Sequence, residues 1–325
     1  MQIKLACPKC NRALESTHIN YFCENSHTYN VVKEIPRFVF GSNYAKSFGI
    51  QWNKFPKTQL DSFTKTKYSY ERLQRIVGDV SVFNGKQVLE VGCGAGRFSE
   101  LILNFGANLF AMDLSNAVEA NLLNNLNSKK YFVCQGDILQ PPIFPGQFEI
   151  VVCLGVLQHT PNPQNTLNAL FQQLAPGGTL FIDSYSMEYP FTLSRKLIRH
   201  FLLKMPEVIR FPIVKFIVTL GWPIHRLLWR TASMTFLQNK RNIQKIRYLF
   251  LRISPIIDYH NAYPQLGVKL MKKWAILDTH DNLTDRYKHL ISMKQFESLL
   301  AESGFIDIVI KIGGNGLEAS AKKQK

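Results

Sequence analysis

The sequence has 325 residues and a mass of 37.3 kDa, which leaves room for two domains or for one large domain with additions. Hydrophobic residues make up 46% of it and charged residues 19%, ordinary values that exclude disordered, collagenous and disulfide-scaffold classes. The formal net charge of +16 favours an anionic partner, whether nucleic acid, a phosphorylated substrate or a membrane surface, without choosing among them.

The apolar stretches of the sequence are too short or too interrupted to predict export or membrane insertion. The beginning, MQIKLACPKC, has neither the length of a secretory signal nor a cleavage pattern behind it, so we expect a cytoplasmic protein. Lys215, Pro223, His225 and Arg226 interrupt the longest apolar stretch, which runs from 211 to 229. Because a spanning helix needs roughly 20 nearly uncharged residues, no transmembrane helix is expected.

Three cysteines and a histidine cluster near the N-terminus. Cys7, Cys10, Cys23 and His27 follow the spacing C-x2-C-x12-C-x3-H. Thiolate and imidazole suit tetrahedral zinc, and two ligand pairs on separate turns can close around the ion. Because the protein supplies all four ligands, we predict a structural zinc in a small ribbon over residues 1–40. Unrelated reduced cysteines are the alternative, since the expected compartment disfavours a disulfide.

The segment 41–84 is rich in aromatic residues, which is not the composition of a linker. Residues 70–77 have a helical pattern with Leu73, Ile76 and Val77 on one face, and Gly78 is a possible stop. We expect the aromatic residues of this segment to pack on the domain that follows.

A strand, a glycine turn and a helix follow one another from residue 87. The strand is predicted at 87–91, the turn at 92–96 and the helix at 97–104. Further strands are predicted at 108–112, 131–134, 148–154 and 179–183, with a helix from about 164 to 174 before a Pro-Gly-Gly turn. The strict alternation of strand and helix predicts a parallel sheet with helices on both faces.

The motifs of this region resemble the class I S-adenosylmethionine-dependent methyltransferases (type 11/12-like) over nearly a hundred residues. VLEVGCGAGRFSE, AMDLS, GDI, FEIVVCLGVLQHTPNP and LAPGGTLFI have the family's order and spacing. The resemblance implies a Rossmann-like, seven-stranded α/β sheet and S-adenosylmethionine as the cofactor. It implies a set of cofactor-binding residues: Glu90, Gly92 and Gly94 at the methionine and ribose part, Asp113 at the ribose hydroxyls, Asp137 and Ile138 at the adenine, Leu154 near the sulfonium, with Gly96 and Leu114 completing the set.

Two observations bear on this cofactor assignment. S-adenosylmethionine has no pyrophosphate, so it tolerates the acidic residue at the entrance of the glycine turn, which would repel the phosphates of a dinucleotide. Tyr44, Gln51 and Trp52 resemble a cofactor-covering stretch of small-molecule members of the family. Ordinary packing under a lid explains these three residues equally well.

His159 is the candidate catalytic base. It follows the fourth strand, at the carboxyl edge where ligands bind in such sheets, and an imidazole can take a proton from a hydroxyl or amine near pH 7. A packing role in the pocket is the alternative. The Pro-Pro-Tyr motif of family members that methylate amino groups is absent. Metal-dependent quinone-type members have glutamates just before the equivalent histidine, whereas this sequence has Gly155 and Gln158 there. We therefore expect no catalytic metal, and Gln158 is a candidate substrate contact.

A basic insertion follows the fifth strand. Residues 186–273 contain 16 Lys and Arg against three acidic residues, a net charge of +13. The segment 186–275 is also amphipathic, and we expect a helical lid over the carboxyl edge of the sheet. Its cations could be solvated, dock on an anionic membrane, or bind RNA. Large apolar residues such as Trp222 and Trp229 among the arginines favour the membrane over RNA.

The last segment, 276–325, is predicted to complete the sheet begun by the core at 85–185. A helix is predicted at 293–303 and a strand from 305, with a further strand after a glycine turn at 313–316. Just upstream, Asp278, His280, Asp281 and Tyr287 are candidate substrate contacts, although a capped loop that packs on the sheet would explain the same residues.

These observations favour a small-molecule methyltransferase that acts on oxygen, rather than carbon or nitrogen, of an anionic or amphipathic intermediate that is lipid- or sugar-linked. Peripheral contact with an anionic membrane is a further expectation. The first alternative is an RNA methyltransferase, because the zinc knuckle resembles that of a bacterial ribosomal-RNA guanine methyltransferase, although the continuation at Ile35 and the insertion do not match it. The second is a scaffold that binds the cofactor without catalysis. The sequence gives no indication of the oligomeric state.

Overall fold

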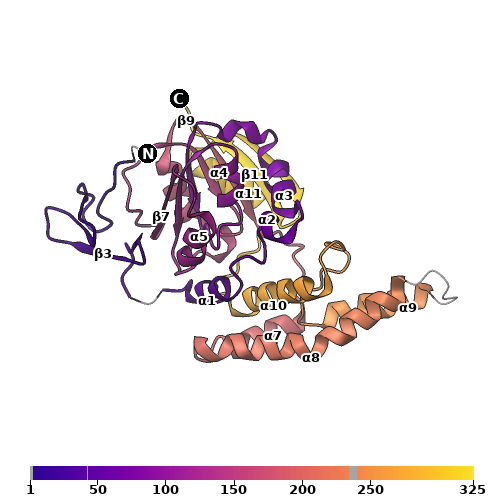
Figure 1. Ribbon diagram of the computed structural model, residues 1–325. Helices are drawn as coiled ribbons and strands as arrows, with labels where there is room; N and C mark the ends of the chain where they lie inside the picture. The colour runs from indigo at the N-terminus through magenta and orange to yellow at the C-terminus, as the bar shows by residue number, and fades with distance from the viewer. Residues whose placement is uncertain (1–2, 42, 234–239) are drawn as a thin grey trace. The chain divides into compact units, whose positions relative to one another are not determined.

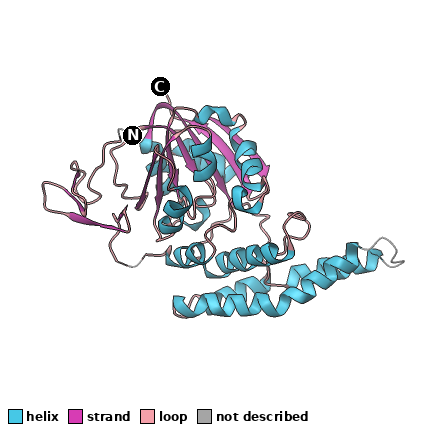
Figure 2. Ribbon diagram, in the orientation of Figure 1, coloured by secondary structure: helices cyan, strands magenta, loops and turns pink. Residues whose placement is uncertain are grey.

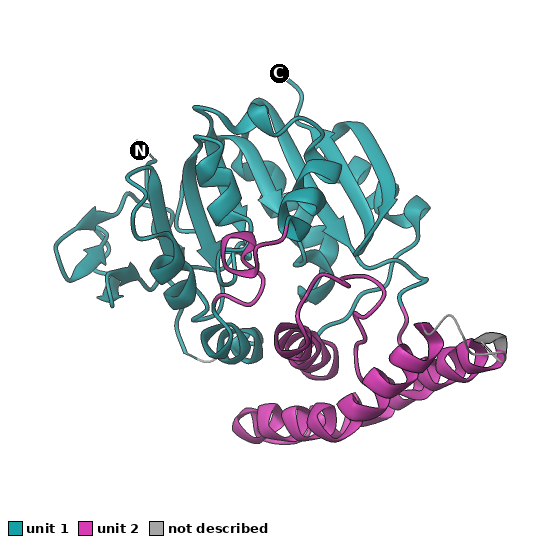
Figure 3. Cartoon of the chain, turned by 45° about the vertical axis from the view of Figure 1, so that its right-hand side comes forward, with its two compact units in different colours: residues 1–56, 67–189, 287–325 teal, residues 57–66, 190–286 magenta. Residues whose placement is uncertain are grey.

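The computed structural model describes residues 3–41, 43–233 and 240–325, and the chain divides into two compact units (Figure 3). Unit 1 contains residues 1–56, 67–189 and 287–325, and unit 2 contains residues 57–66 and 190–286. The residues that carry the predicted cofactor site and those that carry most of the basic insertion therefore belong to different units.

A seven-stranded sheet forms the centre of unit 1 (Figures 1 and 2). Its order is β10-β11-β9-β8-β5-β6-β7, and all neighbours from β9 to β7 are parallel, whereas β11 is antiparallel to both β9 and β10. This confirms the predicted methyltransferase sheet. The strands are β5 (Gln87–Val91), β6 (Asn108–Asp113), β7 (Tyr131–Gln135), β8 (Phe148–Cys153), β9 (Leu174–Ser184), β10 (Ile306–Gly313) and β11 (Gly316–Lys322).

Helices cover both faces of this sheet because successive strand residues point to opposite sides. Val88 packs in one apolar cluster with Leu73 of α3, and its neighbour Leu89 packs in the other with Leu170 of α6. The helices of unit 1 are α1 (Lys46–Lys54), α3 (Tyr68–Val77), α4 (Ser99–Asn104), α5 (Val118–Asn125), α6 (Pro163–Gln173) and α11 (Met293–Glu302), with the 3-10 helices η1 (Val80–Phe83) and η2 (Leu157–His159).

Two local features differ from the sequence predictions. The chain between β7 and β8, residues 136–147, is a loop, so the alternation of strand and helix is not strict. The predicted Pro-Gly-Gly turn at 176–178 lies inside β9, where the pairing with β8 shifts its register between Phe148 and Ile150. A register shift absorbs the residues that cannot continue a regular ladder.

A small sheet in unit 1 carries the N-terminal cysteine cluster. It has the order β1-β2-β3-β4, and its strands are β1 (Glu15–Ser16), β2 (Asn20–Phe22), β3 (Thr28–Val32) and β4 (Ile35–Pro36). Tyr29 and Ile35 are fully buried, and a parallel bridge joins Arg37 to Gln135 at the end of β7. This antiparallel sheet fits the predicted zinc ribbon.

Unit 2 is helical, with α2 (Asp61–Thr64), α7 (Leu193–Leu202), α8 (Glu207–Ser233), α9 (Lys240–Ile253) and α10 (Val268–Thr284). Helix α10 runs along α7 and α8 (Figure 1). Trp274 of α10 is buried and its indole N–H donates to the Thr58 carbonyl. Residues 274–284, for which a capped loop was one interpretation, therefore form part of a helix.

Helix α8 contains two internal prolines. It continues for 27 residues through Pro212 and Pro223, and by length and composition it could cross a membrane. Only 28% of its most apolar window is buried within the protein. One such helix is weak support for a membrane span, since the core helix of a soluble protein passes the same test, and the expected absence of a span stays a prediction.

Candidate functional site

The glycine turn between β5 and α4 requires glycine for two separate reasons. Gly92 and Gly96 have φ angles of +70° and +92°, in the left-handed region that other residues rarely adopt. A Cβ atom on Gly92 would lie 2.1 Å from Cγ2 of Val156, and one on Gly96 would lie 2.6 Å from Nδ2 of Asn125. Side chains from α5 and from the segment after β8 therefore lie close to the backbone of the turn.

Asparagines of α5 hold this turn from behind. The side-chain amide of Asn121 donates to the Cys93 carbonyl at 3.2 Å, and that of Asn124 donates to the Ala95 carbonyl at 2.8 Å. Asn121 is fully buried. Sequence reasoning missed these residues, although a run of asparagines in a helix, NLLNNLN, is unusual enough to have indicated a role.

Asp113 lies at the end of β6 and faces the glycine turn. Its carboxylate accepts hydrogen bonds from the backbone N–H of Gly94 at 2.9 Å and from the N–H and hydroxyl of Ser115 at 2.8 and 2.6 Å. Burial raises the pKa of this carboxyl above its usual range, although the hydrogen bonds from Ser115 and Gly94 lower it in part. Its role as the ribose contact stays a prediction.

Two further predicted carboxylates lie at the ends of β5 and β7, the strands on either side of β6. Glu90 in β5 is 3% exposed, accepts a hydrogen bond from the Ser99 hydroxyl at 2.5 Å, and has a pKa that burial raises to about 8. Asp137 follows β7, accepts a hydrogen bond from the Leu139 N–H at 2.9 Å, and has a pKa that burial also raises. Partly desolvated carboxylates suit a ligand that brings hydroxyl donors or positive charge.

The stretch that contains Tyr44 lies beside these carboxylates. Burial raises the pKa of the Tyr44 hydroxyl, and the nearby Asp137 and Asp113 raise it further. Just before it, the Asn43 side-chain amide donates to the Leu114 carbonyl at 3.0 Å. The predicted covering stretch is thus anchored to the chain that follows β6.

Helix α1 continues this cover. The Asn53 amide donates to the Asn116 carbonyl at 2.9 Å, and Gln51 of the same helix is 1% exposed. A Cβ atom on Gly94 would lie 3.3 Å from Nε1 of Trp52, so the indole lies against the glycine turn. Trp52 therefore lies at the glycine turn and Tyr44 lies near Asp137 and Asp113, whereas Gln51 is buried in the same helix as Trp52.

Two buried apolar residues complete the predicted cofactor set. Ile138, after β7, is 6% exposed, and Leu154, after β8, is 7% exposed. Both lie at the carboxyl ends of parallel strands, the edge at which doubly wound sheets bind their ligands.

His159 in η2 is buried in an aromatic surrounding. Its Nδ1 lies 3.3 Å from the Tyr287 carbonyl, and its ring centroid lies 5.1 Å from that of Phe48 and 5.4 Å from that of Tyr185. Because a carbonyl oxygen can only accept, the Nδ1 carries the proton and the basic lone pair is on Nε2. The Tyr287 ring packs on Tyr44 at 5.3 Å, which links the histidine to the cofactor-covering stretch.

Gln158, the residue before this histidine, has a buried side chain. It is 1% exposed, and neither its amide nitrogen nor its oxygen has a partner among the residues that the structure describes. Its backbone carbonyl accepts a hydrogen bond from the His289 N–H at 2.9 Å. Since an unsatisfied buried amide costs free energy, a bound ligand is a natural partner for it.

One buried carboxylate at this edge was not predicted as a site residue. Asp183, near the end of β9, is fully buried, accepts a hydrogen bond from the Gly155 N–H at 2.6 Å and pairs with Arg72 of α3. The pair fixes the backbone that leaves β8. Sequence spacing could not reveal it, because 111 residues separate the two partners.

The predicted substrate residues Asp278 and His280 belong to α10 of unit 2, where both have internal partners. Asp278 accepts hydrogen bonds from the Gln59 amide at 3.3 Å and from the Tyr259 hydroxyl. Burial lowers the pKa of His280 to about 4, and the Phe211 ring packs on it. Their role in substrate binding stays a prediction.

The N-terminal cluster has the dimensions of a metal site. The ligand atoms of Cys7, Cys10, Cys23 and His27 all lie within 4.8 Å of one another. The Cys10 and Cys23 sulfurs are 3.6 Å apart, and Nδ1 of His27 lies 3.4 and 3.5 Å from the sulfurs of Cys7 and Cys23. Zinc bonds of about 2.3 Å to sulfur and 2.0 Å to nitrogen place tetrahedral ligands roughly 3.5–3.8 Å apart. The four side chains fit the ion.

Comparisons with known proteins agree with this geometry. Residues 89–182 match the family model described as "Methyltransferase domain". The chain is similar to the ubiquinone biosynthesis O-methyltransferase of Pseudomonas fluorescens (strain SBW25), with 34% identity over 104 residues, 31% of this chain and 44% of that protein. It is also similar to the protein of the same name from Erwinia tasmaniensis, with 25% identity over 221 residues, 66% of this chain and 82% of that protein.

Among solved structures, the S-adenosylmethionine dependent methyltransferase from Mesorhizobium loti is similar at 14% identity, with a TM-score of 0.41 over 74% of this chain and 92% of that one. The chain spans less than half the length of the Pseudomonas relative. The motifs, the sheet order and the family match agree: residues 89–182 are a methyltransferase domain, and these findings support a class I S-adenosylmethionine-dependent methyltransferase.

Proposed function

We propose that the protein transfers a methyl group from S-adenosylmethionine to a hydroxyl oxygen of a small-molecule intermediate, lipid-linked or sugar-containing. The observation that carries the proposal is the buried His159, whose basic Nε2 is set by the Tyr287 carbonyl, at the same sheet edge as the predicted cofactor residues. The names of the curated relatives, which are O-methyltransferases, support oxygen as the acceptor.

The residues of unit 1 suit the cofactor by their chemistry. When bound, S-adenosylmethionine supplies an electrophilic methyl group on a sulfonium. Asp113 would accept hydrogen bonds from the ribose hydroxyls. Asp137 and Ile138 would contact the adenine, and Glu90 and the glycine turn would face the methionine part. The carboxylates are already desolvated, so hydrogen bonds from a ligand would offset an existing cost rather than add a new one.

His159 would act as the general base. An acceptor hydroxyl would give its proton to Nε2 as its oxygen takes the methyl group, so the ring becomes a cation that the Tyr287 carbonyl continues to stabilise. The Phe48 and Tyr185 rings restrict the imidazole and exclude water from it. The orphaned amide of Gln158 would orient the acceptor.

The test uses the purified chain, methyl-labelled S-adenosylmethionine and an extract of its own cells. We expect label in the lipid-soluble or small polar fraction, and we expect His159→Gln to lower the rate by about a hundredfold or more without changing cofactor affinity. His18→Gln, an exposed histidine of the ribbon, is the matched control and should keep full activity. Nuclease-sensitive label would contradict the proposal and favour an RNA methyltransferase, and no transfer at all would favour the scaffold.

We also propose that the N-terminal ribbon holds one structural zinc ion. The support is the fit of four soft ligands to a tetrahedral ion and the small size of the four-stranded sheet, which cannot build a large apolar core of its own. With all four ligands supplied by the protein, this zinc would stabilise the ribbon and take no part in methyl transfer.

A further inference from the structure

The helices α7, α8 and α9 of unit 2 expose apolar side chains that a helix of a soluble protein would normally bury. One face of α8 is buried within the unit: Phe211, Val214, Val218, Trp222 and His225. The other face is apolar as well, because Phe216, Leu220 and Leu227 are 62%, 61% and 61% exposed. A surface helix usually carries polar residues opposite its buried stripe, so the second apolar face needs a different explanation.

Helices α7 and α9 also expose apolar residues. The exposed apolar residues recur at helical spacing: Leu193, Leu197 and Phe201 in α7 with Met205 just after it, and Ile246, Leu249 and Ile253 in α9. We call these residues, together with Phe216, Leu220, Ile224 and Leu227 of α8, the α7–α9 surface. Exposed apolar residues in such number mark an interaction surface rather than chance exposure.

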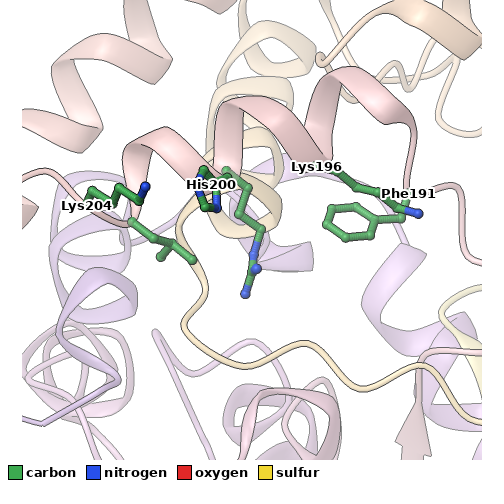
Figure 4. A pocket seen from close by; sticks show the side chains of 6 residues that line it. Phe191, Lys196, His200 and Lys204 are labelled. Atoms are coloured by element: carbon green, nitrogen blue, oxygen red, sulfur yellow. The ribbon is translucent and has the colours of Figure 1, made fainter.

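Cations accompany the apolar stripes. Lys196 and His200 of α7 and Lys204 just after it recur every four residues, each one position before an apolar residue of the surface (Figure 4). With Arg199, Leu203 and Phe191 they line a pocket of about 360 Å³. Arg199 is held by Asp285, so the lysines and the histidine are the groups that an anion would meet.

The segment from 193 to 253 is strongly basic. Between residues 193 and 253 the only acidic residue in the sequence is Glu207. Each of the three helices carries exposed cations: Lys196 in α7 with Lys204 just after it, Lys215, Arg226 and Arg230 in α8, and Lys245 and Arg252 in α9. Apolar residues flanked by lysine and arginine are the pattern of helices that lie in the interface of an anionic bilayer.

The contacts of α8 favour an orientation in the membrane plane over a membrane span. His225 is 1% exposed, and its two ring nitrogens lie 2.8 Å from an Asp258 carboxylate oxygen and 2.8 Å from the Ser254 hydroxyl. Trp222 stacks on His260 at 4.9 Å. A spanning α8 would lose these contacts and place Lys215 and Arg226 in hydrocarbon, at a cost of several kcal/mol.

We propose that the α7–α9 surface docks on an anionic phospholipid bilayer. The apolar side chains enter the boundary of the acyl chains, and Lys196, His200 and Lys204 meet the lipid phosphates. The proposal goes beyond the methyl transfer proposed above and does not depend on it, because vesicle binding is measured without substrate or cofactor.

The test is flotation of the full chain with vesicles. We expect binding to vesicles of equal parts phosphatidylcholine and phosphatidylglycerol, weak binding to phosphatidylcholine alone, and release by high salt. Phe216→Glu with Leu220→Glu should weaken binding by about tenfold or more, and so should Lys196→Glu with Lys204→Glu. All four side chains are exposed, so the variants should fold.

Matched controls come from unit 1. Ile312→Glu changes an apolar residue that is 72% exposed, and Lys129→Glu with Lys130→Glu reverses two exposed cations. These variants should bind vesicles like the unchanged chain. The proposal would be overturned if the chain did not bind anionic vesicles, or if the control variants lost as much vesicle binding as the surface variants. Resistance of the bound chain to alkaline extraction would indicate a spanning helix instead. A stable dimer or RNA complex that the α8 double variant abolishes, while vesicle binding persists, would also overturn it.

Discussion

Unit 1 and unit 2 depart from ordinary protein surfaces and interiors in opposite ways. At the carboxyl edge of the unit 1 sheet, polar groups such as Glu90 and Gln158 are buried. On the α7–α9 surface of unit 2, apolar groups such as Phe216 and Leu220 are exposed. Both arrangements cost free energy in the isolated chain, since one removes polar groups from water and the other leaves apolar groups in it.

The difference indicates what each unit is built to meet. Buried carboxylates and an orphaned amide suit a small polar ligand that supplies matching donors at fixed positions. An exposed apolar surface with cations has no fixed partner geometry and suits an extended, fluid, negatively charged surface. If this comparison is right, changes in one unit should leave the function of the other intact, and the predictions below test that independence.

Removing the zinc ligand Cys10 should have the largest effect. We expect Cys10→Ser, or a chelator, to unfold the first forty residues, because a structural zinc contributes roughly 10 kcal/mol or more to folding. The unchanged chain should contain one mole of zinc per mole of protein by elemental analysis. The rest of unit 1 should still bind cofactor in calorimetry, and His18→Gln should keep its metal. A chain without zinc would remove the assignment, and loss of cofactor binding would tie the ribbon to the candidate site.

Asp113→Ala should weaken cofactor binding by more than tenfold. The expected double hydrogen bond to the ribose would be lost, and charge-assisted bonds contribute about 1.5–3 kcal/mol each. Asp79→Ala, which removes an exposed carboxylate that accepts hydrogen bonds from Ser81, should not change the affinity. Calorimetric titration measures both variants. An unchanged affinity for Asp113→Ala would refute the cofactor assignment, and vesicle binding should be unchanged in either case.

The sequence predicts the parts of unit 1 that depend on local spacing. Cys7, Cys10, Cys23 and His27 lie within twenty-one residues, and their ligand atoms come together as the spacing indicates. The glycine turn and the strands around it follow from short apolar runs and from glycines that only a tight turn requires. The covering role of the stretch around Tyr44 came from the family resemblance, and contacts at Leu114 and Asn116 support its place.

The rest depends on contacts between distant segments, which spacing in one sequence does not reveal. Asp183 and Arg72 meet across 111 residues, and the asparagines of α5 support a turn that precedes them by more than twenty positions. Spacing also does not predict that α8 continues as one helix through Pro212 and Pro223, since proline normally breaks a helix. Packing of its buried face against α9 and α10 stabilises the helix despite the two lost backbone donors.

The two units should also respond to pH with opposite signs. Burial, with Arg210 nearby, lowers the pKa of His280 in unit 2 from 6.5 to about 4. Burial raises the pKa of Glu90 in unit 1 from 4.5 to about 8, with the Ser99 bond opposing and Asp113 adding to the shift. The neutral form is the stable folded form in both cases.

The sign follows from which state binds more protons. The stability from neutral His280 is full above pH 6.5 and is lost as the pH falls through about 4, because the unfolded chain binds the proton first. The stability from neutral Glu90 is full below pH 4.5 and is lost as the pH rises through about 8. Denaturant titrations measure the free energy of unfolding at each pH. The wild-type chain should lose stability at acid pH, and His280→Gln should make that loss smaller by about 2 kcal/mol. Glu90→Gln should reduce the loss of stability at alkaline pH by about as much. If either variant flattened the other limb, the two units would not titrate independently, and the comparison between them would fail.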